Sequence, residues 1–133
     1  MPVKTLDAEL SKLGYEIVEG IKRSDKKTRK NLINHIDKAL GVLMNDGVYA
    51  YYVFCLSKSK QNNEYKKLFI EMPVNCLKDF LNIDYDEMSS DSSNYCEVFF
   101  QNISNNIDEL LFFKNTLEKA LTYTRYHAKA IDE

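Results

Sequence analysis

Arg29 and His35 are the two residues in this chain whose types and spacing could do chemistry on a phosphate. A histidine can transfer a proton near neutral pH, and an arginine can stabilise the negative charge that develops on a phosphate during cleavage. The two residues lie at the start of an expected helix. Along a regular helix their spacing turns the side chains about 120° apart, which does not favour a shared site.

The Arg-x5-His pattern resembles the metal-free active site of HEPN-type ribonucleases, which are also small helical domains. The resemblance implies that Arg29 and His35 would act together on an RNA phosphate. That family favours Asn or Asp directly after the arginine, whereas this chain has Lys30. Such a spacing of Arg and His also arises readily by chance. We therefore interpret the segment as a basic first helical turn with a surface histidine, and keep a metal-independent ribonuclease as an alternative function.

Other catalytic and metal-binding patterns are weaker still. There is no glycine-rich phosphate loop, and the acidic residues between 84 and 91 lack the spacing and glycine of an EF-hand. A Cys–His pair would have to be assembled by tertiary structure, because nothing in the local sequence proposes one. We expect no catalytic residue, no metal and no cofactor. The cysteines are odd in number and form no Cys-x-x-Cys pair, so we expect reduced, mostly buried thiols: Cys55, Cys76 and Cys96.

Helices are the elements expected to position these side chains. Only four Gly and two Pro occur in 133 residues. Leucine and isoleucine recur at three- or four-residue steps over residues 5–23 and again over 32–43. A further apolar stripe spans residues 64–81, where Pro73 predicts a kink or two short helices. A last stripe predicts a long helix over about 105–131.

Residues 42–58, VLMNDGVYAYYVFCLSK, decide between a hairpin and two helices. Asp-Gly between apolar runs is a hairpin signal. The helical stripe before the Asn-Asp-Gly triplet and the lack of a convincing partner strand favour a helix stop, because glycine accepts positive φ. We predict a central helix after Gly47, with a hairpin to residues 40–44 as the alternative. We expect three tyrosines of this run in the core, with hydroxyls at its edge: Tyr49, Tyr51 and Tyr52.

The helix ends and connections complete the expected fold, an all-α single-domain bundle of five to six helices over residues 1–133 with a long C-terminal helix. Gly14 and Gly20 would allow a close helix crossing. We expect a basic loop at 57–63 and a flexible acidic loop at about 82–94, and leave 95–103 open between a helical turn and an extended segment. The expected N-terminal caps come in pairs of candidates: Thr5 or Asp7, Ser24 or Asp25, and Ser104 or Asn105.

Charge is distributed unevenly along the chain. Residues 22–67 contain eleven Lys or Arg and four Asp or Glu, whereas residues 79–113 contain eight Asp or Glu and no Lys or Arg. This asymmetry favours a polyanion partner, or copies that stack basic region against acidic region. A basic helix start also suits phosphate. The candidate nucleic-acid-binding residues are Lys22, Arg23, Lys26, Lys27, Arg29, Lys30, Lys58, Lys60, Arg125 and Lys129.

Two segments resemble the small helical subunit of type III-B (Cmr) CRISPR-associated effector complexes. One is IDKALGVLMNDGVYAYYVFCLSKSK, which matches the family's helix–Asn-x-Gly–helix centre followed by Ser-Lys. The other is LLFFKNTLEKALTYTRYHAKAI, which matches its last helix. Together they cover about a third of the chain. The Leu-Pro often seen before the family's central stretch is replaced by Leu40-Gly41, and its Gly-Leu by Gly47-Val48. The matching positions are Asn45, Gly47, Phe54, Leu56, Ser57, Lys58, Thr116, Glu118, Ala120, Leu121, Tyr123, Tyr126 and Lys129.

The resemblance implies a non-catalytic subunit that stacks in several copies beside other effector subunits in antiviral defence. Its basic side chains would hold guide RNA and target RNA by backbone contacts without sequence specificity, while RNA cutting belongs to the neighbouring backbone subunit. A protein-only helical adaptor is a further alternative. The N-terminus MPVKTLDAEL has no apolar signal region and no segment is expected to cross a membrane, so we expect a cytoplasmic protein.

Overall fold

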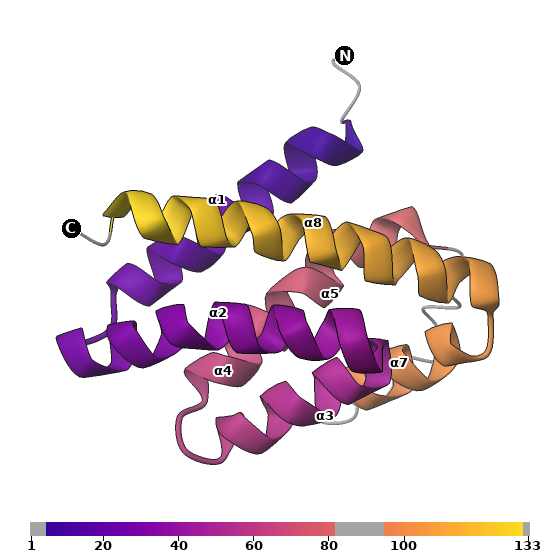
Figure 1. The fold of residues 1–133 in the computed structure, drawn as a ribbon. Coiled ribbons are helices and arrows are strands. Elements are labelled where there is room, and N and C mark those ends of the chain that lie inside the picture. The colour runs from indigo at the N-terminus through magenta and orange to yellow at the C-terminus, as the bar shows by residue number, and fades with distance from the viewer. Residues whose placement is uncertain (1–4, 82–94, 132–133) are drawn as a thin grey trace.

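The computed structural model describes residues 5–81 and 95–131, and these form an all-α bundle without strands. The fold class predicted from the sequence is therefore confirmed, including the long C-terminal helix (Figure 1). The expected acidic loop at 82–94 lies outside the described residues. The elements are α1 (Leu6–Lys22), α2 (Lys26–Asp46), α3 (Val48–Ser59), α4 (Glu64–Lys66), the π-helical η1 (Lys67–Glu71), α5 (Met72–Leu77), the 3₁₀ turn η2 (Lys78–Phe80), α7 (Tyr95–Ser104) and α8 (Ile107–Ile131).

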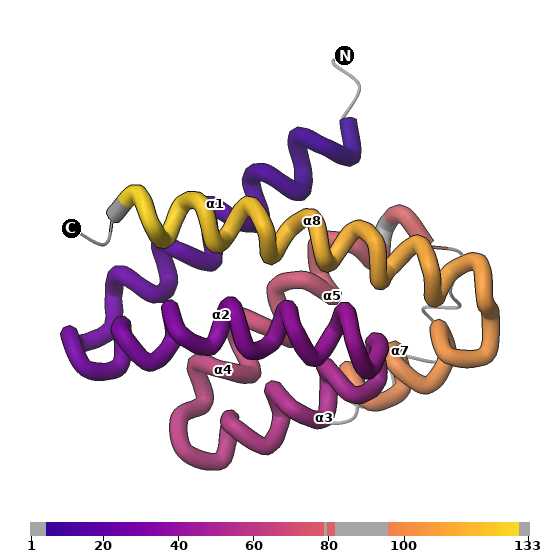
Figure 2. Tube along the Cα trace, in the orientation of Figure 1, coloured from indigo at the N-terminus to yellow at the C-terminus, as the bar shows by residue number. Residues whose placement is uncertain are grey.

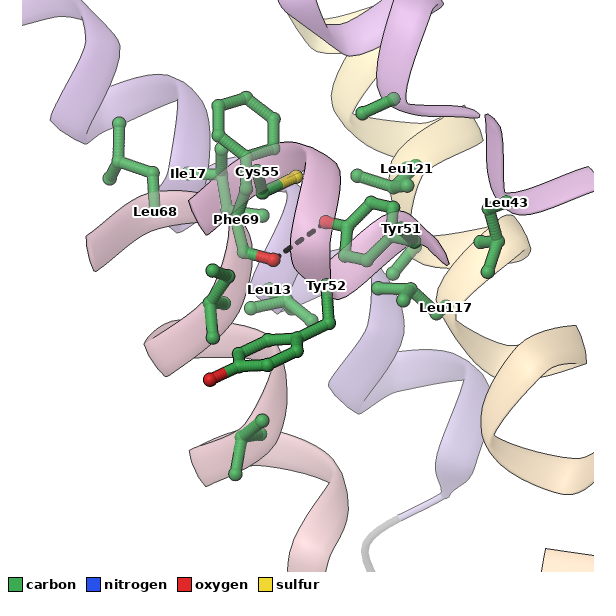
Figure 3. Packing of buried hydrophobic residues seen from close by; sticks show 14 of the residues in the cluster. Leu13, Ile17, Leu43, Tyr51, Tyr52, Cys55, Leu68, Phe69, Leu117 and Leu121 are labelled. Atoms are coloured by element: carbon green, nitrogen blue, oxygen red, sulfur yellow. Dashed lines mark hydrogen bonds between the residues drawn. The ribbon is translucent and has the colours of Figure 1, made fainter. Parts of the chain in front are cut away.

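One hydrophobic core holds the described helices together. The apolar stripes predicted for the first two helices are buried, and α8 contributes Phe113, Leu117 and Leu121. Figure 3 shows leucines of α1, α2 and α8 gathered around Tyr51 of α3. Each such side chain contributes about 1.5–3 kcal/mol when fully buried. None of the described helices combines the length and apolar character that a bilayer crossing requires.

The helices α1 and α8 cross closely at Gly14, as the sequence suggested. A Cβ atom built on Gly14 would lie 3.0 Å from the backbone N of Thr124 and 3.1 Å from Cβ of Tyr123. Gly20 makes room in the same way for Leu68 of η1, since a Cβ atom there would overlap Cδ2 of that leucine. The two glycines therefore let α1 pack against α8 and η1.

Gly47 alone connects α2 to α3, so the Asn-Asp-Gly triplet is a helix stop rather than a hairpin. Its φ of 97° lies in the region that only glycine adopts easily. The Gly47 N–H donates to the carbonyl of Leu43 at the end of α2, and its own carbonyl accepts from the N–H of Tyr51 in α3. The tube in Figure 2 reverses direction here, and α3 runs back along α2.

Pro73 explains why the chain after α4 does not form a regular α-helix. Proline has no N–H, so it cannot donate to the carbonyl of Phe69 four residues earlier. In the structure the π-helical η1 precedes the proline, and the buried hydroxyl of Tyr51 donates to the Phe69 carbonyl at 2.6 Å (Figure 3). The tyrosine thus satisfies an acceptor that the proline leaves open. The Tyr51 hydroxyl was expected at the core edge, but it lies inside the core because of this bond.

The predicted N-terminal caps are confirmed at the first two helices, and the cap predicted for the last helix is wrong. Thr5 accepts from the N–H of Ala8, and Asp25 accepts from the N–H of Thr28 at 2.7 Å. At α8 the capping side chain is Asn106 rather than Ser104 or Asn105, because its Oδ1 accepts from the N–H groups of residues 108 and 109.

Three smaller expectations are resolved or corrected. Residues 95–104 form a helix, which closes the question left open for 95–103. The loop expected at 57–63 is shorter, because α3 continues to Ser59. Tyr49 was expected in the core, yet its ring is 43 % exposed and its hydroxyl donates to Glu97 of α7.

Candidate nucleic-acid interface

The densest basic cluster lies where α1 ends and α2 begins (Figure 1). The three-residue turn between the helices contains Asp25, whose carboxylate caps α2. All six cations predicted for this junction are exposed to solvent: Lys22, Arg23, Lys26, Lys27, Arg29 and Lys30. We call these six residues the junction cluster.

Two members of the junction cluster have partners within the protein. Lys22 forms an ion pair with Glu19 at 3.4 Å. The guanidinium of Arg29 donates to the backbone carbonyl of Lys22 at 3.1 Å and so closes the C-terminal end of α1. Within the described part of the chain, no acidic side chain forms an ion pair with the remaining four cations, so their charges face solvent: Arg23, Lys26, Lys27 and Lys30.

The cations predicted on α8 differ in availability. Arg125 is paired with Asp37 of α2, with 2.9 Å between Nε and Oδ1. Lys129 is exposed and has no ion pair among the described residues. The Arg125–Asp37 pair ties α8 to α2, and it places Arg125 beside the helix that carries most of the junction cluster.

The two cations predicted at the end of α3 also differ. Lys58 is half-buried, and its Nζ lies 5.8 Å from the centroid of the Phe54 ring, so its ammonium group makes a cation–π contact within α3. Lys60 is exposed and follows the last residue of α3. Lys60 therefore presents its charge to solvent, whereas Lys58 packs against its own helix, and the predicted role of both in RNA binding stays a prediction.

A cleft of about 590 Å³ separates α1 from the segment around η1. Arg23, at the end of α1, and Lys67, at the start of η1, both line this cleft. Its lining also contains the carboxylates of Glu16, Glu19 and Glu64. Because acids outnumber bases here, the cleft itself does not suit a polyanion, and the positive surface is the exposed junction beside it.

His35 is buried, which corrects the expectation of a surface histidine. Its side chain is 2 % exposed and sits among three aromatic rings. The ring stacks on Phe54 with centroids 5.3 Å apart and meets Tyr65 and Phe69 edge-on at 4.8 and 4.6 Å. Arg29 is exposed and bonded to a backbone carbonyl. The structure does not bring the two side chains to a common groove.

Tertiary structure does assemble a Cys–His pair that the local sequence did not indicate. Nε2 of His35 lies 3.4 Å from Sγ of Cys55, with both residues buried. Burial lowers the pKa of His35 to about 4, helped by the nearby charges of Lys58 and Lys38, and burial raises the pKa of Cys55 to about 12. A nucleophilic cysteine needs the opposite arrangement, a thiolate stabilised by a protonated histidine. The pair is therefore neutral and serves packing.

Among the described residues, no group of three or more His, Cys, Asp or Glu is placed to hold a metal ion. The acidic residues between 84 and 91 lie outside the described ranges. Cys55, Cys76 and Cys96 form no disulfide within the described ranges. Two of them, Cys55 and Cys96, are buried, and Cys76 is partly accessible. Comparison of the chain with family models, with curated proteins and with solved structures found no match.

Proposed function

We propose that this protein is a non-catalytic, RNA-positioning subunit of a ribonucleoprotein, of the kind found as the small subunit in type III CRISPR effector complexes. The junction cluster holds guide RNA and target RNA through phosphate contacts without reading their bases. Several copies stack beside other effector subunits. The observation that carries the RNA contact is a group of four exposed cations at one helix junction that form no ion pair with any described residue.

Phosphate recognition is the chemistry that this junction suits best. Lys and Arg side chains neutralise phosphates and release bound counterions, which gives affinity without sequence specificity. The N-terminus of α2 adds the positive end of a helix dipole to the same place. The stacking of copies and the identity of the complex rest on the resemblance of the two sequence segments. The uneven charge of the chain agrees with a basic region that contacts RNA and an acidic region that contacts the next copy.

The ribonuclease alternative has less support. A general acid or base must reach the proton that it transfers. His35 is enclosed by aromatic rings and held neutral, and Arg29 lies exposed and bonded elsewhere. No second function is favoured by a specific observation on the described residues.

RNA binding by purified protein, measured by fluorescence anisotropy over a range of salt concentrations, tests the proposal. Replacing the four free cations of the junction cluster by Gln should weaken binding and reduce the slope of log K against log salt by about three, since each phosphate contact contributes about 0.7–0.9. The variant carries Arg23→Gln, Lys26→Gln, Lys27→Gln and Lys30→Gln.

A matched control changes the net charge equally at four lysines outside the cluster: Lys12→Gln, Lys38→Gln, Lys114→Gln and Lys119→Gln. It should keep most of the slope. Equal loss in both variants would show that only net charge matters and would remove the proposed interface. Metal-independent RNA cleavage that disappears in His35→Ala would instead establish the ribonuclease.

A further inference from the structure

One face of α2 carries only polar side chains and a glycine along almost the whole helix. Its members follow one another at steps of four, three, four, three and four residues. At 3.6 residues per turn their directions stay within about 80° of each other. All of its side chains are exposed to solvent. We call the following residues the polar face of α2: Lys27, Asn31, Asn34, Lys38, Gly41 and Asn45.

The donor groups in the middle of this face have no partner within the described part of the protein. The side chains of Asn31, Asn34 and Lys38 form no hydrogen bond or ion pair with any described residue. Asp37 directly precedes Lys38 and therefore points about 100° away from it, and Arg125 of α8 holds its carboxylate at 2.9 Å. The polar face thus offers free donors and no acidic side chain.

Positive charge continues from the polar face onto α3. Helix α2 lies between α8 and α3 (Figure 1), and the sequence of α3 contains no Asp or Glu. After burial itself, the charges of Lys58 and Lys38 lower the pKa of His35, so both ammonium groups lie near this ring. Cations therefore stand at two places along the polar face, at the junction cluster and beside Lys38.

Gly41 is the glycine that the fold itself does not explain. Gly14 and Gly20 make room for packed neighbours, and Gly47 adopts a positive φ. Gly41 lies inside α2, where glycine weakens the helix relative to alanine. A Cβ atom built on it meets no heavy atom within 4 Å, so packing does not require its absence. What glycine provides here is room for an external ligand to approach the helix backbone closely.

The side-chain types indicate which ligand this face suits. A partner helix that packed along such a four-three spacing would need apolar residues there, and the polar face has none. Ammonium and amide groups are donors to phosphate and sugar oxygens, and such contacts position a nucleic-acid strand without reading its bases. The face is therefore better suited to a nucleic-acid backbone than to a protein helix.

We propose that the polar face of α2 is a contact surface for the sugar–phosphate backbone of RNA, which runs from the junction cluster along α2 past Gly41. This inference rests on the proposed RNA-positioning function and extends its contact surface with uncharged donors. Lys27 and Lys38 contact phosphates. Asn31 and Asn34, which lie between them, donate to phosphate or ribose oxygens. Gly41 lets the strand lie against the helix backbone.

Two changes that leave the net charge unaltered test this inference by fluorescence anisotropy with a labelled single-stranded RNA. Asn31→Ala/Asn34→Ala should weaken binding about tenfold, because each lost hydrogen bond costs roughly a factor of three to ten. The salt dependence should stay the same, since no cation is removed. Gly41→Leu should weaken binding at least about fivefold by holding the strand away from the helix.

Lys38→Gln addresses the charged part of the same face. It should reduce the slope of log K against log salt by about 0.7–0.9, the value of one phosphate contact. The same single contact is the loss expected of the four-lysine control variant, which contains this substitution and so keeps most of its slope.

Matched controls separate the polar face from general surface effects. Asn75→Ala/Asn115→Ala removes two exposed asparagines from α5 and α8, and Ser11→Leu places a leucine on the exposed side of α1. Both variants should bind RNA as the wild type does. Alanine and leucine are better helix formers than asparagine and glycine, so the test variants should remain folded, which circular dichroism checks.

The outcomes distinguish this inference from the function on which it rests. If the asparagine variant and Gly41→Leu both bind RNA as tightly as the wild type, the polar face is no RNA contact, while the junction cluster stands. If Gly41→Leu leaves RNA affinity unchanged but alters the mass of the protein in sedimentation, the face contacts another protein chain and the inference is overturned. If the wild-type protein binds no RNA at low salt, the proposed function and this inference both fall.

Discussion

His35 shows how burial changes the chemistry of a single residue. Its ring is enclosed by Phe54, Tyr65 and Phe69, so the protonated form loses its hydration, and the charges of two lysines oppose protonation further. The folded pKa of about 4 lies below the usual 6.5. The unfolded chain therefore binds a proton more readily than the native protein whenever the pH lies between these values.

The free energy of unfolding should fall as the pH is lowered from about 6.5 toward 4. Above pH 7, titration of His35 should make no contribution to the pH dependence of stability. Below both pKa values the loss of stability totals about 3 kcal/mol, of which about 2 kcal/mol is already lost at pH 5. Urea unfolding of wild type and His35→Phe at pH 7.5 and pH 5 measures this. The variant should lose much less stability between the two pH values. Equal losses would contradict a neutral, buried His35.

Single residues also decide the course of whole helices. Gly47 ends α2 and starts α3 through one backbone conformation, and Pro73 forces the chain of η1 and α5 away from regular α-helical bonding. Gly41 offers a contrast, since it lies inside α2, has no positive φ, and has no heavy atom within 4 Å of a Cβ built on it.

The two glycines should respond oppositely to alanine. Gly47→Ala should destabilise the protein by about 1–3 kcal/mol, because the positive φ of 97° strains any residue with a Cβ. Gly41→Ala should stabilise it by about 0.5–1 kcal/mol, because alanine is the better helix former and meets no neighbour. Thermal or urea unfolding of the two variants gives both values. A neutral Gly47→Ala would mean that the α2–α3 connection can adopt another conformation.

At the scale of the whole molecule, ion pairs between helices decide which cations remain for a ligand. Arg125 was predicted as an RNA contact, but Asp37 of α2 holds its guanidinium. Both side chains are largely exposed, and exposed pairs contribute little to stability. The main effect of this ion pair is therefore to hold the Arg125 guanidinium at Asp37, and its contribution to the stability of the bundle is small.

Asp37→Asn should release Arg125 and raise RNA affinity, with a slightly steeper salt dependence, because one more cation can contact phosphate. The melting temperature should change little. Asp46→Asn is the matched control, since it removes another exposed carboxylate from α2 and leaves Arg125 untouched. The same gain in affinity from both variants would show that Arg125 is not an RNA contact.

The sequence by itself determined the helices, their apolar faces and the density of the basic junction. These are local properties, because helical period, caps and glycine conformation depend on residues within a turn or two. Leu10, Ile17, Leu32 and Phe113 are buried as their spacing predicted. The predicted cap of α8, Ser104 or Asn105, is one or two residues away from the observed cap, Asn106. Each of these neighbouring polar side chains is of a type that can accept a hydrogen bond from the first N–H groups of a helix.

Only the tertiary structure decided which polar side chains are free. It buried His35 beside Cys55, used the Tyr51 hydroxyl on a carbonyl that Pro73 leaves open, and paired Arg125 with Asp37. Each partner lies at least 18 residues away along the chain. Contacts of that kind depend on how helices pack, and side-chain type and spacing do not contain that information.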